Sequence, residues 1–375
     1  MRKRPSRRPD HRCIALALLV ALGACRARDD ATKGKEEKPV PETGTKMRPA
    51  AVKIVYPAAP GSFVGLVQDA RASVVHLKAA GPVTGGPDEL FPGSEPGAAL
   101  GTGFVVDRDG TILTNDHLIS RAPEIRAVLA DGTELSARVI GRDAKLDVAL
   151  LDVDEVPALT PARLGGSENL QIGEWVVALG NPYGTEVTAS AGIVSSLGKS
   201  DRDELVRPLQ GATAYRSFLR TDAVITARNS GGPLVNMAGE VVGIATAVKS
   251  PAGSAGFAIP IDRALQILPM LKTDGVVSRA WLGVYIHPVD PERARFLKLP
   301  AATGALVSDV ERPGPAADAG IEPGDVILKI GDKEVDHQTL PWLASTLPIG
   351  KPTPFVVWRD RDERNLNVIP IKTPD

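Results

Sequence analysis

The sequence predicts a mainly β protein, in which an all-β barrel or sandwich is followed by a small α+β module. Short runs rich in Val, Ile, Leu and Thr begin at about residue 61 and alternate with turn residues. No long helical pattern separates these runs before residues 261–275. Beyond residue 278, two short helix-like segments stand among further strand-like runs. A chain of 375 residues is also long enough for more than one domain.

The first 24 residues predict an export signal. A basic stretch, "MRKRPSRRPDHR", precedes the twelve apolar residues "CIALALLVALGA". This run is too short to span a bilayer, which takes about 20 residues, and is typical of a secretory signal. "LGAC" at 22–25 resembles the lipobox of bacterial lipoproteins, which predicts lipidation of Cys25 after cleavage. A plain signal peptide with a chance cysteine is the alternative.

Residues 25–60 predict a flexible tether, because they are charged, then Pro-rich, and have no hydrophobic period. Such a tether would hold the folded part of the chain away from a membrane surface. Cys13 and Cys25 are the two cysteines of the chain, so the mature protein has no cysteine pair to form a disulfide.

Residues 61–275 are expected to form the first folded domain. Its apolar helix pattern at 261–275 ends at Gly275, a favourable C-terminal cap. The strand-like segments before it are 72–80, 101–119, 124–141, 147–154, 174–181 and 231–250.

Residues 278–372 are expected to form a second domain of about 95 residues, a normal domain size. Strands are predicted at 280–287 and 304–311, and further strands at "DVILKI", "TPFVVWRD" and "RNLNVIPIK". The two helix candidates are "GPAADAG", which would end at Gly320, and 337–348.

Three residues in different segments together predict a nucleophilic hydrolase. Ser230 lies in the loop "NSGGPL", His117 stands where a strand meets a helical turn, and Asp147 opens "DVALLDVD". A serine hydroxyl needs a base and a group that orients the base. His–Asp–Ser is the chain order of chymotrypsin, distinct from the orders of subtilisin and of α/β-hydrolases. His76, His287 and His337 are interpreted as structural residues.

Four ordered segments resemble the HtrA (Deg) family of serine proteases: "TGFVVDRDGTILTNDHLI", "DAKLDVALLDVD", "IGEWVVALGNPYGTEVTASAGIVSSLGKS" and "LRTDAVITARNSGGPLVN". Residues 278–372 resemble the PDZ domain that follows the protease in that family. The resemblance therefore covers about 61–372 and implies a chymotrypsin-like double β-barrel followed by one PDZ domain.

The resemblance also implies roles for individual residues. Ser230 would attack a peptide carbonyl, His117 would transfer its proton, and Asp147 would orient the imidazole. The backbone N–H groups of Ser230 and Arg228 would form the oxyanion hole. Ile225 would floor a primary specificity pocket that favours small aliphatic side chains; simple core burial of Ile225 is the alternative.

Two residues depart from the family pattern. Arg228 replaces the glycine that such loops normally hold two places before the serine. If the active loop needs a positive φ at this position, the change costs on the order of 1–2 kcal/mol, and the loop then prefers a flipped, inactive form. Asp116 stands beside His117, where the family usually has a neutral residue.

"WLGV" at 281–284 resembles the PDZ loop that captures the terminal carboxylate of a peptide. The backbone N–H groups of Trp281, Leu282, Gly283 and Val284 would hold that carboxylate, and the peptide would add as a strand beside the segment that follows. An ordinary strand entry is the alternative.

The sequence gives no indication of nucleic-acid, metal or cofactor binding. The formal net charge of −1 and the 4% aromatic content give no reason to expect a nucleic-acid partner. No HExxH motif, Cys/His metal cluster or phosphate-binding loop occurs, so neither a metal nor a cofactor is expected.

The sequence therefore predicts an exported serine endopeptidase of the cell envelope, lipid-anchored on the periplasmic side. Its expected partners are unfolded or damaged proteins, peptide C-termini at the PDZ domain, and two further copies in a homotrimer. A catalytically attenuated peptide-binding chaperone or regulator is the main alternative, because of Arg228. A processing protease with a single client is the third.

Overall fold

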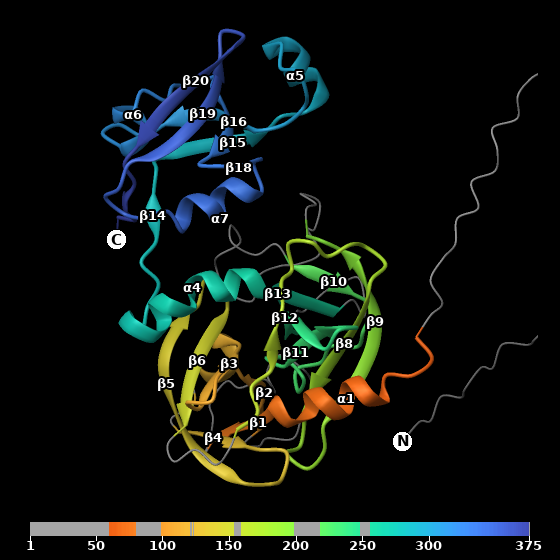
Figure 1. The fold of residues 1–375 in the computed structure, drawn as a ribbon. Coiled ribbons are helices and arrows are strands. Elements are labelled where there is room, and N and C mark those ends of the chain that lie inside the picture. Colours follow the sequence, from red (N-terminus) through yellow and green to blue (C-terminus); the bar gives the residue numbers. More distant parts are fainter. Residues whose placement is uncertain are drawn as a thin grey trace, which may run out of the picture. The chain divides into compact units, whose positions relative to one another are not determined.

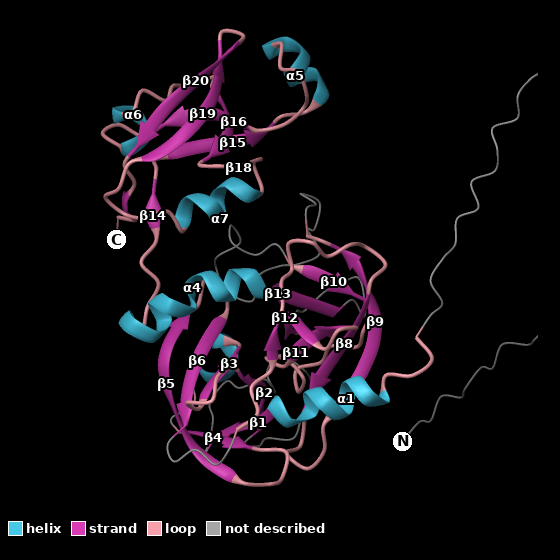
Figure 2. Ribbon diagram, in the orientation of Figure 1, coloured by secondary structure: helices cyan, strands magenta, loops and turns pink. Residues whose placement is uncertain are grey.

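A computed structural model describes residues 60–79, 99–120, 122, 124–153, 159–198, 218–247 and 256–374. The predicted signal, Cys25 and the tether up to residue 59 lie outside the described residues. Figure 1 shows the fold, and Figure 2 shows the same view by secondary structure, with strands predominating.

Six antiparallel strands form a closed barrel in the order β1-β2-β3-β6-β5-β4. Apolar side chains such as Leu77, Ile112 and Leu151 pack together in its core, and all three are fully buried. The strands are β1 (Val74–Ala79), β2 (Ala99–Val105), β3 (Thr111–Thr114), β4 (Ile125–Val128), β5 (Glu134–Asp143) and β6 (Val148–Val153).

The next strands form a second closed ring, because the order β11-β8-β9-β10-β13-β12 is completed by pairing of β12 with β11. The short β7 adds to β12 in parallel. Of the two folds predicted from the strand pattern, barrel or sandwich, the barrel is confirmed. The strands are β7 (Arg163–Leu164), β8 (Trp175–Gly180), β9 (Thr188–Ser196), β10 (Leu219–Thr221), β11 (Pro233–Asn236), β12 (Glu240–Thr246) and β13 (Gly256–Pro260).

Helix α4 (Ile261–Asp274) follows the second barrel and confirms the predicted helix. Its apolar face is buried, and Gly275 ends it with a left-handed φ of 72°. Gly141 of β5 lies against α4 so closely that a Cβ there would be 2.4 Å from the Leu271 carbonyl oxygen. The shorter helices of this part are α1 (Val64–Ala70), the 3₁₀ turn η1 (Arg71–Ser73) and α3 (Asp116–Ile119).

Residues 280–372 form a separate mixed fold with its own apolar core, which includes Leu282, Ile327 and Phe355. Its main sheet has the order β15-β16-β17-β19-β20, with β18 paired to β17, and β14 pairs with β21. The strands are β14 (Ala280–Trp281), β15 (Val284–Pro288), β16 (Ala305–Val310), β17 (Val326–Ile330), β18 (Lys333–Glu334), β19 (Thr353–Arg359), β20 (Asp362–Val368) and β21 (Ile371–Lys372). The helices are α5 (Pro291–Leu297), α6 (Pro315–Asp318) and α7 (Thr339–Ser345).

Candidate active site

His117 and Asp147 meet because the strands next to them pair. β3 ends at Thr114, which pairs with Ala149 of β6, so the turn after β3 faces the residue before β6. His117 Nδ1 lies 2.8 Å from Asp147 Oδ2 and 3.0 Å from Oδ1. The His117 backbone N–H donates to Asp147 Oδ1 over 2.9 Å. The neutral imidazole therefore carries its proton on Nδ1, which leaves Nε2 as the basic nitrogen.

Asp147 itself is held in an uncommon backbone conformation, with φ of 64°, and is buried. A non-glycine residue in the left-handed region costs on the order of 1 kcal/mol and persists only where its surroundings enforce it. Here the conformation turns the carboxylate toward both nitrogen donors of His117. Strained residues of this kind concentrate at functional sites.

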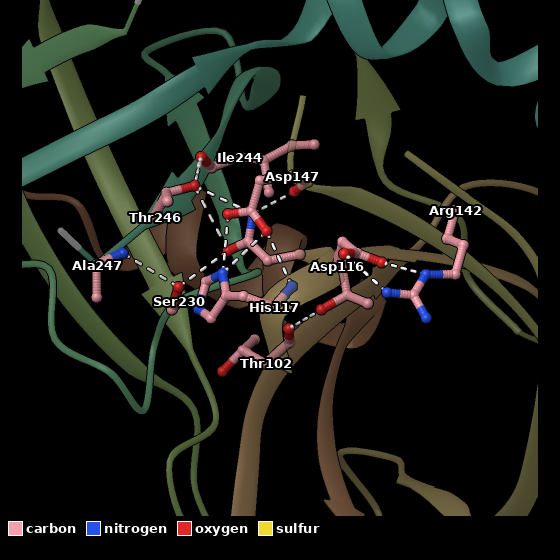
Figure 3. A network of polar contacts seen from close by, with 11 residues as sticks. Thr102, Asp116, His117, Arg142, Asp147, Ser230, Ile244, Thr246 and Ala247 are labelled. Carbon is pink, nitrogen blue, oxygen red and sulfur yellow. Dashed lines mark hydrogen bonds and ion pairs between the residues drawn. The ribbon is translucent and has the colours of Figure 1, made fainter. Parts of the chain in front are cut away.

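Ser230 enters the same network from the second barrel, just before β11 (Figure 3). Its side chain is fully buried, and its hydroxyl donates to Asn115 Oδ1 over 2.9 Å. The Ser230 oxygen accepts from the Ala247 N–H over 3.1 Å. Because a hydroxyl has one proton, this arrangement gives that proton to Asn115 rather than to His117.

Asn115 is a site residue that sequence reasoning missed. Its Nδ2 donates to the Asp147 carbonyl over 3.0 Å and to Thr246 Oγ1 over 3.1 Å. These bonds orient the amide so that its oxygen faces Ser230. Its place directly before the "DH" pair, at the N-cap of α3, was the available signal.

The loop before Ser230 forms one helical turn. The Ser230 N–H donates to the Thr226 carbonyl over 3.0 Å, so the donor assigned to the oxyanion hole has a partner inside its own loop. Thr102 Oγ1 donates to the Arg228 carbonyl over 2.9 Å. The described non-glycine residues with positive φ are Asp147, Lys298, Asp360 and Arg361, so Arg228 does not adopt the left-handed conformation.

Asp116 is buried beside the site and pairs with Arg142 of β5. Arg142 Nε lies 2.7 Å from Asp116 Oδ1, and Nη2 lies 3.1 Å from Oδ2. Figure 3 shows the carboxylate turned toward Arg142. Burial raises the pKa of Asp116, while the Arg142 guanidinium opposes that shift. The extra acid next to His117 is therefore compensated by a cation.

Ile225 is partly buried and packs against the core of the second barrel. A Cβ on Gly256 would lie 3.1 Å from Ile225 Cδ1, so the two residues are in close contact. The structure thus shows Ile225 packed against the core, and its role as the floor of a specificity pocket stays a prediction.

The four residues at 281–284 run from the last residue of β14, through the turn at Leu282 and Gly283, to the first residue of β15. Leu282 is buried in the core of this fold, and Gly283 has a left-handed φ of 76°. Their carbonyls are engaged, since Leu282 O accepts from Ala316 N–H and Gly283 O from Glu311 N–H. Among the described strands, β15 pairs only with β16, which leaves its second edge open for a peptide strand.

No group of three or more His, Cys, Asp or Glu side chains suited to a metal occurs among the described residues. Within the same ranges, no helix is long and apolar enough to cross a membrane.

Comparisons with known proteins match both folds. Residues 101–244 match the trypsin-like peptidase domain, and residues 280–369 match the PDZ domain. A probable periplasmic serine endoprotease DegP-like of Hahella chejuensis is 39% identical over 335 residues, covering 82% of this chain and 69% of the relative. The chain belongs to the HtrA family.

Two further proteins with a similar sequence or structure support this assignment to the HtrA family. The DegP-like protein of Halomonas elongata is 40% identical over 289 residues, which cover 75% of this chain. The chain spans only 58% of that relative's length. The solved HtrA-type protease AlgW with tripeptide is 33% identical, with a TM-score of 0.67, covering 84% of this chain and 98% of that one.

Proposed function

We propose that this HtrA protein is a serine endopeptidase that uses Ser230, His117 and Asp147. The observation that carries the proposal is the His117 Nδ1 pair with the Asp147 carboxylate at 2.8 Å, in one network with a buried Ser230. Asp147 fixes the tautomer, Nε2 takes the proton of the Ser230 hydroxyl, and the hydroxyl attacks the peptide carbonyl. The imidazolium then protonates the leaving amine, and water hydrolyses the acyl-enzyme.

The structure corresponds to a resting state in this proposal. Two rearrangements precede attack: the Ser230 hydroxyl leaves Asn115 for His117, and the Ser230 N–H leaves the Thr226 carbonyl. The N–H groups of Arg228 and Ser230 then face the oxyanion. Removing one such donor costs about 10²–10³ in kcat, so the resting loop is slow rather than inert.

The non-catalytic alternative has its own support. Both polar groups of Ser230 are engaged elsewhere, and Arg228 stands in place of glycine. A peptide-binding chaperone or regulator with attenuated catalysis fits these observations.

Digestion of a permanently unfolded protein tests the two functions against each other. The purified full-length chain in detergent should produce peptides, whereas Ser230→Ala and His117→Ala should produce none above background. Two results contradict the proposal. One is digestion that persists in Ser230→Ala. The other is that the folded wild type digests nothing, whether or not peptides that occupy the PDZ domain are added.

The remaining parts of the proposal concern location and partners. The domains are 61–275 and 278–372, behind a signal peptide and a tether. The chain is exported to the periplasmic side of the cell envelope and anchored by a lipid on Cys25. The relatives named periplasmic support the compartment. Peptide C-termini bind beside β15, with the backbone N–H groups of residues 281–284 as donors to the terminal carboxylate. Unfolded or damaged proteins are the substrates.

A homotrimer is proposed through the N-terminal helix. α1 has no buried residue, and Val64 is 61% exposed although it is apolar. The Phe63 ring packs in a tilted arrangement against Trp175, with ring centroids 5.7 Å apart, and Ile172, close to Trp175 in sequence, is 65% exposed. Exposed apolar groups of this kind mark contacts between proteins.

A further inference from the structure

Among the residues that the structure describes, the guanidinium of Arg228 has no acidic partner. Arg228 is half-buried, precedes Ser230 by two residues, and forms no ion pair within the described part of the chain. Its side chain lies over the Tyr183 ring, with the guanidinium carbon 5.1 Å from the ring centroid. A stack occupies the face of the guanidinium and leaves the N–H donors along its edge available. Those donors match the two oxygens of a carboxylate.

The residues beneath this stack are tied together. Thr102 Oγ1 donates to the Arg228 carbonyl over 2.9 Å and accepts from the Asn181 N–H over 3.1 Å. The same hydroxyl therefore fixes the loop of Arg228 and the start of the loop that carries Tyr183.

His76 holds the second loop from the other side. Its Nδ1–H donates to the Asn181 carbonyl over 2.8 Å. Gly184 packs on the imidazole with φ of 75°, and a Cβ there would lie 3.1 Å from His76 Cδ2. The backbone on both sides of Tyr183 is therefore held in place, while the ring itself is 68% exposed and accessible to a bound peptide.

We propose that Arg228, seated on Tyr183, is a specificity-determining residue that selects polypeptides with an Asp or Glu side chain beside the scissile bond. The inference rests on the proposed function, because it assigns the substrate class of the same site. A substrate carboxylate would receive two N–H donors from the edge of the guanidinium.

The test compares peptides that differ only in charge. The peptides are C-terminally amidated and have small aliphatic central residues. They come in pairs, in which one position beside the cleavage site is Glu in one peptide and Gln in the other, and each flanking position is tested in turn. The ratio of kcat/KM for the Glu and Gln peptides is measured in each enzyme, so that any general loss of catalysis cancels. Wild type should prefer Glu by roughly three- to tenfold at its best position, and less at high salt.

Variants of Arg228 and Tyr183 test whether these two residues cause the preference for Glu. Arg228→Gln should bring the Glu/Gln ratio to about one. Arg228→Lys should keep part of the preference for Glu, because the positive charge stays but the planar pair of guanidinium N–H donors is lost. Tyr183→Leu should weaken the ratio, whereas Tyr183→Phe, which keeps the ring, should preserve it. A ratio near one in wild type, or an unchanged ratio in Arg228→Gln, overturns the inference while leaving the proteolytic function intact.

A binding measurement decides the inference even if no cleavage occurs. Fluorescent versions of the same peptides are titrated with the full Ser230→Ala chain, and their amidated ends lack the carboxylate that a PDZ domain captures. The Glu peptide should bind roughly three- to tenfold tighter than its Gln partner, and this difference should vanish when Arg228→Gln is added. Equal binding of both peptides overturns the inference, whereas absent Ser230-dependent cleavage counts against the proposed function alone.

Discussion

At the residue scale, single hydrogen bonds set the state of the candidate site. The one proton of the Ser230 hydroxyl goes to Asn115, and the Ser230 N–H goes to Thr226. Each bond is worth about 1 kcal/mol net, so the two together hold a resting state that a bound peptide could displace.

The Asp116–Arg142 pair gives a prediction about stability. Arg142→Ala leaves a buried carboxylate without its cation, whereas Asp116→Ala leaves a half-exposed guanidinium that water can solvate. Arg142→Ala should therefore lower the free energy of unfolding more than Asp116→Ala, by about 1–3 kcal/mol, as chemical denaturation at pH 7 would measure.

The pH dependence of that loss has a definite sign. Burial already raises the pKa of Asp116, and removing Arg142 removes the group that opposes the shift. The folded state of Arg142→Ala then keeps the Asp116 proton to a higher pH than the unfolded state does. Its deficit relative to wild type should therefore shrink as the pH falls toward the ordinary pKa of 3.8. A deficit that grows on acidification would contradict this account.

The sequence singled out three residues that the structure brings into one network, but it did not predict the hydrogen bonds within that network. His117, Asp147 and Ser230 each stand next to a strand end, in the chain order of chymotrypsin, and their catalytic roles stay a prediction. Asn115 was missed because an asparagine before a helical turn is usually only a cap. Which rotamer Ser230 adopts depends on competing bonds of similar energy, and no local pattern encodes that balance.

At the element scale, the long helix α4, most of the strands and the short helices α6 and α7 were predicted, whereas α1 and α5 were not. α4 has buried apolar residues at helical spacing and a glycine cap. α1 has only seven residues, and its Leu66, Val67 and Ala70 lie partly buried against the barrel core while Val64 stays exposed. α5 was missed although Asp290 caps it, accepting from the Arg293 N–H, and Pro291 opens it.

The exposed apolar surface at α1 predicts assembly. Wild type should have the mass of three chains by light scattering after size-exclusion chromatography in detergent. Val64→Lys combined with Ile172→Lys should reduce that mass to one chain, because two cations are placed in an apolar contact. The matched control is Val139→Lys with Val276→Lys, which alters two other exposed valines and should leave the trimer intact. A single-chain mass for wild type would refute the assembly.

At the scale of the whole molecule, two closed barrels each supply part of one site. His117 and Asp147 come from the turns of the first barrel, and Ser230 comes from the second. The Thr102 N–H of β2 donates to the Ser230 carbonyl over 2.9 Å, which ties the two barrels together at the site. Closure of both barrels could be predicted only through the family resemblance, because the strand pattern alone allowed a sandwich.

The buried His76 should make the folding stability of the molecule depend on pH. Burial lowers the pKa of His76 below its usual 6.5, and the positive charges of Lys78 and Arg228 add to that shift. As the pH falls below 6.5, the unfolded chain takes up a proton that the folded chain refuses, so folding stability falls with pH.

A variant whose side chain at position 76 does not titrate isolates the contribution of His76 to this pH dependence. Between pH 7.5 and 5.5, wild type should lose on the order of 1 kcal/mol more unfolding free energy than His76→Gln, by urea denaturation at each pH. Parallel pH profiles for the two proteins would show that His76 does not titrate differently on unfolding.

The central claim is that Ser230 is an activated nucleophile whose loop rests in a closed turn. Labelling of the purified chain by a fluorescent fluorophosphonate tests it most directly, with Ser230→Ala as the blank. The account predicts slow labelling of wild type that requires Ser230. Arg228→Gly should label about tenfold faster or more, because glycine frees the loop to present its N–H donors. No Ser230-dependent labelling in either folded protein would contradict the claim.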